Sequence, residues 1–254
     1  MAAAARTALV TGAAKRIGRG IAEDLAAHGF AVAIHCNRSR QEADSLAEQL
    51  RQSGARAEVV QADLTDASET DALIARATKA LGPIGLLVNN ASIFTDDSVE
   101  TFDPAVADRH FAIHVNAPAV LSRRFAEALP EKSEGLIVNV IDQRVWRLTP
   151  RYFSYTLSKS ALWTATQTMA QALAPAIRVN AIGPGPTLAN TRQEKDDFQA
   201  QVDGLILNRG PALAEFGAAI RFLWEARSVT GQMIALDGGQ HLAWQTPDVT
   251  GMVE

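Results

Sequence analysis

A tyrosine and a lysine stand four residues apart in the second half of the chain, at Tyr155 and Lys159. They lie at the start of a long helical pattern, where residues four apart project from one face. An ammonium beside a phenol stabilises the phenolate, so the pair predicts a tyrosine pKa lowered from about 10 toward the working range. Such a tyrosine could act as a general acid while hydride arrives elsewhere on the substrate. The alternative is two solvated helix residues.

A glycine-containing turn near the start of the chain could hold a phosphate-bearing cofactor. It reads TGAAKRIGRG from Thr11 to Gly20, after an apolar run and before a helical pattern that begins near Ile17. Backbone N–H groups of such a turn, and the positive end of the helix, approach a pyrophosphate closely. The turn therefore predicts a dinucleotide site.

The end of the second apolar run indicates which dinucleotide is bound. An NAD site would place Asp or Glu there to hold the ribose 2′-hydroxyl. The sequence instead reads HCNRS from His35 to Ser39, with no carboxylate until Glu42. Arg38 and the Ser39 hydroxyl can bind a 2′-phosphate by charge-assisted hydrogen bonds, so NADP(H) is predicted. A plain solvated arginine is the alternative.

The elements that must position these residues alternate along the chain. Short apolar runs are each followed by a longer segment with apolar residues at three- and four-residue steps, which predicts strands joined by crossover helices. We expect an α/β fold with one domain over residues 1–254, a Rossmann-like, doubly wound, seven-stranded parallel sheet with helices on both faces. The predicted strands are 8–11, 31–35, 57–61, 85–89, 136–141, 177–182 and 233–236, and the predicted helices are 17–28, 41–53, 68–81, 106–129, 152–174 and 212–225.

Composition excludes several other classes of protein. The chain has 254 residues, of which 47% are apolar and 20% charged, so disorder is not expected. It contains no apolar run long enough for a membrane span, and its first residues do not resemble a secretory signal. The single cysteine fits a reducing compartment, and the net charge of −4 argues against nucleic acid as a partner. We therefore expect a cytoplasmic protein. The five histidines share no metal-ligand spacing, so no metal site is predicted.

One segment between the last two predicted strands lacks a regular pattern. It runs from Gly183 to about Gly210, opens with GPGPT and continues polar and charged. A long loop at the carboxyl edge of a doubly wound sheet usually borders a ligand. We predict a flexible substrate lid over about residues 186–208, with an ordinary surface insertion as the alternative.

These motifs, in this order and spacing, resemble those of the short-chain dehydrogenases/reductases over roughly residues 6–243. The match is carried by the turn of residues 11–18, Asp63-Leu64, Asn89-Asn90-Ala91, Asn116, Tyr155 with Lys159, Arg178-Val179-Asn180, Pro184-Gly185, Val229-Thr230-Gly231 and Asp237-Gly238-Gly239. The resemblance implies that Asp63 and Leu64 contact adenine and that the Asn90–Ala91 backbone lines the cofactor cleft. It also implies that Lys159 holds the nicotinamide ribose, that Asn116 supports a water of the proton relay, and that Pro184 and Gly185 flank the nicotinamide. The full predicted cofactor site is Gly12, Lys15, Arg16, Ile17, Gly18, His35, Asn37, Arg38, Ser39, Asp63, Leu64, Asn90, Ala91, Ser92, Tyr155, Lys159, Pro184, Gly185 and Thr187.

Two positions depart from the general family pattern and narrow the resemblance. Arg16 replaces the middle glycine of the phosphate turn, and Asp142 replaces the catalytic serine. Both replacements are shared with the pteridine reductase and dihydromonapterin reductase branch, which the sequence resembles closely. The segments HCNRS and NNASIF resemble that branch's 2′-phosphate site and substrate wall.

The chemistry of a pterin fits these residue types. Phe94 could sandwich a flat, nitrogen-rich ring against the nicotinamide, with a core phenylalanine as the alternative. Arg16 and Ser92 would contact the pterin edge and the cofactor phosphates. Asp142 beside Tyr155 could relay the proton that C=N reduction requires at nitrogen, with a strand-end cap as the alternative. The predicted catalytic residues are Asp142, Tyr155, Lys159 and Asn116, and the predicted substrate residues are Arg16, Ser92, Phe94, Asp142 and Tyr155.

The predicted function is NADPH-dependent reduction of a pteridine, whether a dihydropteridine, dihydromonapterin or a dihydrofolate-like compound. A carbonyl reductase acting on a ketone, aldehyde or 3-oxoacyl group is the alternative, and a non-catalytic NADP(H) sensor is a third reading. Family resemblance also implies a homotetramer built on the helices over 106–129 and 152–174, with Phe125 and Trp163 as interface or core residues.

Overall fold

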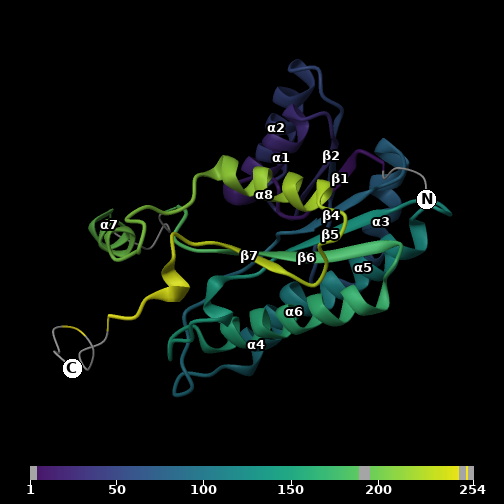
Figure 1. Ribbon diagram of the computed structural model, residues 1–254. Helices are drawn as coiled ribbons and strands as arrows, with labels where there is room; N and C mark the ends of the chain where they lie inside the picture. The colour runs from purple at the N-terminus through teal and green to yellow at the C-terminus, as the bar shows by residue number, and fades with distance from the viewer. Residues whose placement is uncertain (1–4, 189–194, 246–249, 251–254) are drawn as a thin grey trace.

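The computed structural model describes residues 5–188, 195–245 and 250, and its centre is a seven-stranded sheet (Figure 1). The strand order is β3-β2-β1-β4-β5-β6-β7, and every neighbouring pair is parallel. The predicted fold is therefore confirmed, and the predicted strands lie within two residues of the observed ones. The strands are β1 (Thr7–Val10), β2 (Ala31–Cys36), β3 (Ala57–Gln61), β4 (Leu86–Asn89), β5 (Gly135–Val140), β6 (Ile177–Pro184) and β7 (Met233–Leu236).

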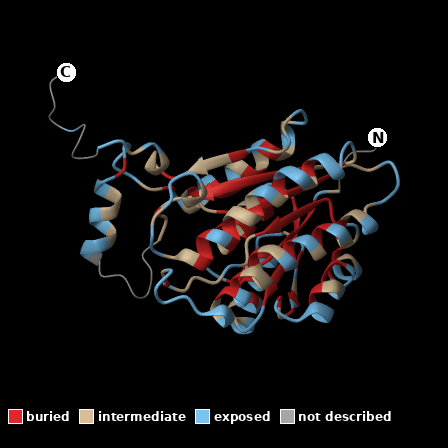
Figure 2. Ribbon diagram, turned by 90° about the horizontal axis from the view of Figure 1, so that it is seen from below, coloured by how far each residue is buried: buried red, intermediate tan, exposed pale blue. Residues whose placement is uncertain are grey.

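Helices cover both faces of the sheet. One face packs against α1, α2 and α8, and the other packs against α3, α5 and α6. Parallel strands buried on both faces are expected to be apolar throughout, and β1, β2, β4 and β5 are buried at every residue (Figure 2). The helices of these two layers are α1 (Arg16–Ala27), α2 (Arg40–Gln52), α3 (Ala67–Leu81), α5 (Ala117–Ala128), α6 (Phe153–Ala172) and α8 (Leu213–Glu225).

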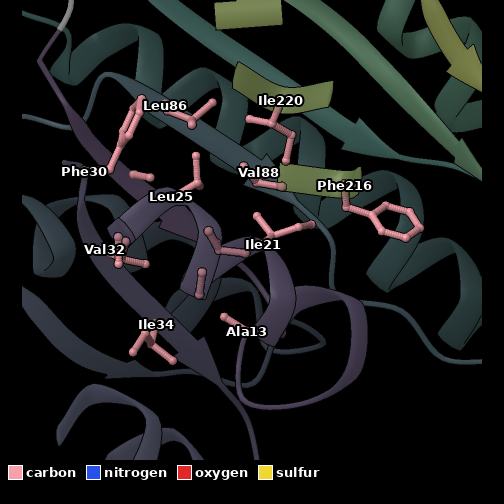
Figure 3. Packing of buried hydrophobic residues seen from close by; sticks show 14 of the residues in the cluster. Ala13, Ile21, Leu25, Phe30, Val32, Ile34, Leu86, Val88, Phe216 and Ile220 are labelled. Atoms are coloured by element: carbon pink, nitrogen blue, oxygen red, sulfur yellow. The ribbon is translucent and has the colours of Figure 1, made fainter. Parts of the chain in front are cut away.

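The core on the first face joins the phosphate-turn helix to the C-terminal part of the chain. Ile21 and Leu25 of α1 meet Phe216 and Ile220 of α8 above the sheet, and all four are fully buried (Figure 3). Burying side chains of this size contributes about 1.5–3 kcal/mol each. The turn before α1 is thus held by a rigid layer.

The strand order places a topological switch between β1 and β4, because β2 and β3 extend to one side and β5, β6 and β7 to the other. In open parallel sheets, ligands bind beyond the carboxyl ends of the strands at this point. The predicted site residues follow the carboxyl ends of β1 to β6 or lie on helices beside them.

The predicted helix over 106–129 is interrupted. It consists of α4 (Pro104–Phe111), a π-helical segment η1 (Ala112–Asn116) and α5. π-helical turns are rare and often mark functional positions. This one contains Asn116 and the buried His114. Phe125 of α5 is 1% exposed in the core, so its predicted interface role is wrong and its alternative core role is confirmed.

The predicted lid segment is more regular than the sequence pattern indicates. It contains a helix, α7 (Lys195–Asp203), which lies to one side, away from the sheet (Figure 1). The helix is polar along most of its length, so it lacks the apolar periodicity that identified the others. Residues 189–194 of the predicted lid lie outside the described residues. Among the described helices, none is both long and apolar enough to cross a membrane.

Candidate active site

Tyr155, Lys159 and Asp142 are brought together where β5 ends beside α6. The Tyr155 hydroxyl donates a hydrogen bond to Asp142 Oδ2 at 3.0 Å. Lys159 Nζ donates to the carbonyl of Val140, the last residue of β5, at 2.8 Å and lies 5.7 Å from the centre of the tyrosine ring. Tyr155 and Lys159 are 6% and 2% exposed, so they are not the solvated helix residues of the alternative interpretation.

Asp142 uses its two carboxylate oxygens for different purposes. Oδ1 accepts the backbone N–H of Arg144 at 2.9 Å and so caps the short 3-10 helix η2 (Gln143–Val145). Oδ2 accepts the Tyr155 phenol. The strand-end cap and the contact with the tyrosine are therefore both present in one side chain. Anchoring one oxygen fixes the other against the phenol.

The electrostatics of this group differ from the sequence prediction. Burial, together with the Asp142 carboxylate, raises the pKa of Tyr155 well above its usual value. The prediction that Lys159 lowers this pKa is wrong for this structure, because burial and the carboxylate dominate. Burial also raises the pKa of Asp142, and it lowers the pKa of Lys159 to about 8, which Asp142 partly offsets. The phenol is therefore protonated near neutral pH, as a proton donor must be.

The phosphate turn has the backbone geometry of an anion site. Gly12 has φ +63°, and Arg16, where the family has a glycine, has φ +54°. A Cβ on Gly18 would lie 2.3 Å from the Gly12 carbonyl oxygen, so only glycine fits there. The helix α1 that follows has Lys15 as its N-cap with no side-chain capping bond. Its first N–H groups are thus left without a side-chain cap at the end of the turn.

His35 has a different role from the predicted contact with the cofactor. It is 2% exposed, its Nδ1 accepts the Gly12 N–H at 3.0 Å, and its Nε2 lies 3.1 Å from the Ala62 carbonyl. The first bond makes Nδ1 the acceptor, so Nε2 carries the proton. Burial lowers the pKa of His35 to about 4, which keeps it neutral. His35 therefore braces the phosphate turn against β2 and β3.

Three polar residues gather at the carboxyl ends of β2 and β3, where the 2′-phosphate is predicted. Asn37 and Arg38 are exposed, and both lower the pKa of Asp63, whose main stabilising partner is Thr65. Arg38 forms no salt bridge with any carboxylate in the described part of the chain. Ser39 is the N-cap residue of α2. Arg38 is thus available for an anion.

Three other predicted cofactor residues have contacts within the protein. Lys15 forms a 2.6 Å salt bridge with Glu42, the first carboxylate after β2. Leu64 is buried in the core and packs with the residues of the second face, whereas its neighbour Asp63 is partly exposed. Ile17 is half-buried against the first core. Their contacts with a cofactor stay predictions.

The loop after β4 is tied to the phosphate turn through Thr11, which the sequence prediction did not single out. Thr11 Oγ1 accepts the backbone N–H groups of Asn90 and Ala91, each at 2.9 Å. The Asn90 amide donates in return to the carbonyls of Thr11 and Gly12, at 2.8 and 3.2 Å. The Asn90–Ala91 backbone is thereby fixed beside the turn, as the predicted cleft requires.

Arg16 connects the phosphate turn to the segment after β6. Its guanidinium donates to the carbonyl of Leu188 at 3.2 Å. Gly185 passes so close to Asp237 that a Cβ would lie 2.6 Å from the Asp237 Cα, and Thr187 Oγ1 donates to the Gly185 carbonyl at 3.0 Å. The Pro184–Thr187 segment is thus held at the edge of the predicted cleft.

Phe94 lies against the catalytic tyrosine rather than in either core cluster. Its ring meets Tyr155 edge-on with centroids 4.8 Å apart and lies against Tyr152 at 4.6 Å. The Arg144 guanidinium lies over the same ring at 5.7 Å. Phe94 is half-buried in a loop, so the alternative of a core phenylalanine is wrong.

Ser92 and Asn116, the remaining predicted site residues, are both exposed. Ser92 Oγ lies 2.9 Å from Nε2 of the buried His114, one of the five histidines that lack metal-ligand spacing. Asn116 ends η1, and its water-binding role stays a prediction. Within the described residues no group of three or more His, Cys, Asp or Glu could hold a metal ion.

Comparison with known proteins defines the class. A family model described as short chain dehydrogenase matches residues 6–200. The chain therefore belongs to the short chain dehydrogenase family. Among its relatives are an uncharacterised oxidoreductase of Bacillus subtilis, 32% identical over 93% of this chain and 99% of that protein, and bovine L-xylulose reductase, 34% identical over 93% and 96%.

Some solved structures have a higher sequence identity to this chain than the relatives described above. FolM alternative dihydrofolate reductase 1 from Brucella canis, complexed with NADP, is 59% identical and superposes with a TM-score of 0.93 over 96% of this chain and 97% of that chain. The corresponding protein from Brucella suis, also in complex with NADP, is 59% identical with a TM-score of 0.94, over 96% and 98%.

Proposed function

We propose that this protein is an NADPH-dependent reductase that reduces a C=N bond of a pteridine. The observation that carries the proposal is the hydrogen bond from the Tyr155 phenol to Asp142 Oδ2, where an ordinary carbonyl reductase of the family would have a serine hydroxyl. Two solved structures that are 59% identical to this chain are named alternative dihydrofolate reductases and are complexes with NADP, which supports both parts of the proposal.

The residues of the phosphate turn fit NADP(H). The uncapped N-terminus of α1 and the close approach at Gly18 suit a pyrophosphate, and Arg38 suits a 2′-phosphate. Glu42, which would repel that phosphate, is paired with Lys15. When bound, the reduced cofactor supplies the hydride that is added to the carbon of the C=N bond.

Tyr155 supplies the proton that completes the reduction. Its hydroxyl passes the proton to the nitrogen of the C=N bond as the carbon accepts hydride, so that the product gains one C–H and one N–H bond. The raised pKa keeps the phenol protonated before the reaction. Lys159 stabilises the phenolate that remains, since its ammonium lies 5.7 Å from the ring centre.

Asp142 orients the Tyr155 hydroxyl before the reaction and changes its own protonation state after Tyr155 has lost its proton. In the ground state the carboxylate holds the phenol through Oδ2, while Oδ1 is anchored at the N–H of Arg144. Burial raises the pKa of Asp142, so the carboxyl group can take up a proton from water and pass it to Tyr155 after Tyr155 has given its own proton to the substrate nitrogen. The two groups share protons as a coupled pair.

Phe94 would form the wall against which the flat ring is held, and Arg16 and Ser92 would contact its polar edge. Phe94 already lies edge-on against Tyr155, so a ring stacked on it would reach the proton donor. Ser92 is exposed two residues away from Phe94. These contacts select a planar, nitrogen-rich substrate.

A carbonyl reductase is the second candidate, since L-xylulose reductase and 3-oxoacyl reductases are among the relatives at 28–34% identity. In such an enzyme a neutral hydroxyl stabilises the developing oxyanion, whereas the Asp142 carboxylate would repel it. The site therefore favours nitrogen over oxygen as the atom to be protonated.

Three further features belong to the proposal. The chain forms one NADP(H)-binding domain, and residues of about 186–208, which include α7, close over the bound substrate. The protein is a cytoplasmic homotetramer whose interfaces involve α4, η1, α5 and α6. Half-exposed apolar residues on the outer side of α6, such as Leu157, support such contacts.

The proposed function is tested by following oxidation of NADPH with dihydrobiopterin, dihydromonapterin and dihydrofolate, and with a panel of ketones and aldehydes. We expect turnover with at least one pteridine. The kcat/KM for this pteridine should exceed the kcat/KM for every ketone and aldehyde in the panel. Turnover of ketones with all pteridines inert would refute the proposal in favour of the carbonyl reductase.

Replacement of Arg38 by alanine should change the choice of cofactor. A hydrogen bond to a charged group contributes about 1.5–3 kcal/mol, so we expect KM for NADPH to rise by about 10- to 150-fold with little change for NADH. The control is Arg40→Ala, because Arg40 is also exposed but is already paired with Asp44 at 2.8 Å. Equal effects of the two variants would show that Arg38 does not bind the 2′-phosphate.

Ionisation of Lys159 should limit activity at high pH. The ammonium is the active form and its pKa is lowered to about 8 by burial, so activity is full below this pH and falls above it. Because kcat/KM reports the free enzyme, kcat/KM for NADPH should fall about tenfold per pH unit above about 8. In Lys159→Arg, which stays charged, this fall should be absent. A wild-type profile that is flat to about pH 10 would contradict the assignment.

A further inference from the structure

Two buried histidines, His110 of α4 and His114 of η1, face α6 one helical turn apart. His110 Nδ1 lies 2.8 Å from the Ser154 hydroxyl, and His114 Nδ1 lies 2.8 Å from the Ser158 hydroxyl. Their rings are stacked with centroids 5.6 Å apart, and they are 0% and 1% exposed. The two histidines therefore have matching surroundings on the Nδ1 side.

They differ at Nε2. His110 Nε2 is buried and has no hydrogen-bond partner among the described residues. His114 Nε2 lies 2.9 Å from the Ser92 hydroxyl and 3.3 Å from the backbone nitrogen of Ile93. Only His114 thus reaches a residue of the predicted substrate site.

The hydrogen bonds fix the tautomer of His114. The Ser158 hydroxyl donates its single proton to the Tyr155 carbonyl at 2.7 Å, so it must accept from His114 Nδ1. The N–H of Ile93 can only donate, so Nε2 must be an acceptor. Burial and the charge of Lys159 lower the pKa of His114 well below its usual range, consistent with a neutral ring.

An accepting Nε2 determines what Ser92 can offer to the cleft. The Ser92 hydroxyl has one proton, and it has three groups within reach: His114 Nε2 at 2.9 Å, the Ile93 carbonyl at 3.3 Å and the Tyr155 side chain, which itself donates to Asp142. We take His114 Nε2, which can only accept, as the group that receives the proton. With that proton directed inward, only the lone pairs of the exposed Ser92 oxygen remain for the Tyr155 side chain and for a substrate. Ser92 then accepts hydrogen bonds and does not donate them.

We propose that His114 is a positioning residue that orients the Ser92 hydroxyl as a hydrogen-bond acceptor, and thereby selects substrates that present an N–H donor. This inference rests on the proposed function, in which Ser92 contacts the polar edge of the ring. An exocyclic amino group of a pteridine is such a donor, whereas an oxo group at the same position is an acceptor. A mismatch would leave two oxygens facing each other without a proton between them.

The chain of hydrogen bonds through His114 leads away from the Tyr155 hydroxyl, and Ser92 is its only member that also interacts with that hydroxyl. It runs from Ser92 through His114 to Ser158 and ends at the Tyr155 carbonyl, which carries no exchangeable proton. Because it ends inside the protein, its effect is on orientation.

The test compares kcat/KM for a 2-amino dihydropteridine with kcat/KM for the analogue that carries an oxo group in place of the amino group. The wild-type protein should prefer the amino compound. In His114→Asn, which can still donate to Ser158 but is too short to reach Ser92, we expect this preference to shrink about tenfold, because the freed hydroxyl can donate to the oxo group. His114→Gln, whose amide oxygen reaches further, should restore part of the preference.

The matched control is His110→Asn, which removes a stacked histidine of the same helix face without touching Ser92. It should leave the preference unchanged even if it lowers stability. Ser92→Ala should reduce the preference, and adding His114→Asn to Ser92→Ala should reduce it no further, because both changes act on one hydroxyl. Equal losses with both substrates in His114→Asn would assign His114 a purely structural role and overturn the proposal.

A second measurement does not depend on turnover. In the ¹⁵N spectrum of the protein with labelled histidine, assigned by comparison with His114→Asn, we expect a neutral His114 ring with its proton on Nδ1. A proton on Nε2, or a doubly protonated ring near neutral pH, would overturn the inference. Failure of both pteridines to react, with this tautomer present, would refute the proposed function and leave the orientation of Ser92 established.

Discussion

Replacement of Tyr155 by phenylalanine should lower kcat by about 100- to 10,000-fold while leaving the affinity for NADPH nearly unchanged. The size follows from the loss of a positioned general acid. The variant keeps the aromatic ring, so its edge-on contact with Phe94 is retained. The only group removed is the hydroxyl that donates to Asp142 at 3.0 Å. Steady-state kinetics with a pteridine, and titration of NADPH binding by fluorescence, measure the two quantities.

The chain offers a matched control, because Tyr152 is its only other tyrosine. The Tyr152 hydroxyl makes no hydrogen bond with a described residue, and its ring also contacts Phe94, with centroids 4.6 Å apart. Tyr152→Phe should therefore change kcat by less than about threefold, since no proton donor is lost. Similar losses in the two variants would show that the site depends on aromatic hydroxyls in general and would contradict the role given to Tyr155.

Replacement of Asp142 by asparagine should lower kcat for the pteridine by about 100-fold or more. The asparagine oxygen can still cap η2 at the N–H of Arg144, but the amide cannot take up a proton beside the phenolate. Because the neutral amide removes a buried carboxylate, thermal stability should be retained or increased. Kinetics and thermal unfolding of the same preparation separate these effects.

Asp142→Ser provides the complementary change, since it restores the hydroxyl typical of the family. We expect it to lose pteridine reduction to a similar degree and to gain measurable reduction of ketones, because a hydroxyl can stabilise an oxyanion that a carboxylate repels. Retention of pteridine turnover in both variants would show that Asp142 is only a helix cap.

Much of the fold could be predicted from the sequence because each strand is a short apolar run between helical patterns. That alternation indicates a parallel sheet, and the observed boundaries lie within two residues of the predicted ones. The sequence does not predict the helix α7 because the residues of that helix, KDDFQAQVD, are mostly polar and show no apolar periodicity. The π-helical segment η1 was missed because it continues the periodicity of the helices on either side.

The sequence predicts which residues form the catalytic group from their types and spacing, but it does not predict their contacts or their pKa shifts. The contact between Tyr155 and Asp142 depends on where η2 begins, and the raised pKa of the tyrosine depends on burial that periodicity does not report. His35 was assigned to the cofactor because it sits at a strand end, yet burial gives both its nitrogens backbone partners.

One signal for the histidine network was present in the sequence. His110 and His114 are four residues apart, and so are Ser154 and Ser158 on another helix. Two equal spacings on packed helices are compatible with paired hydrogen bonds, but sequence alone does not set the register between the helices. In the structure, α4 and η1 pack against α6 in the register that pairs each histidine with one serine.

The most direct test of the account is to follow the hydride itself. The purified protein is incubated with a dihydropteridine and NADPH that carries deuterium at both C4 positions of the nicotinamide, and the product is analysed by mass spectrometry and NMR. Hydride addition to a C=N bond predicts a tetrahydropteridine with one deuterium, bound to the ring carbon, and with its new N–H proton derived from water. Formation of no deuterated tetrahydropteridine, while ketones become deuterated at the carbinol carbon, would contradict the account.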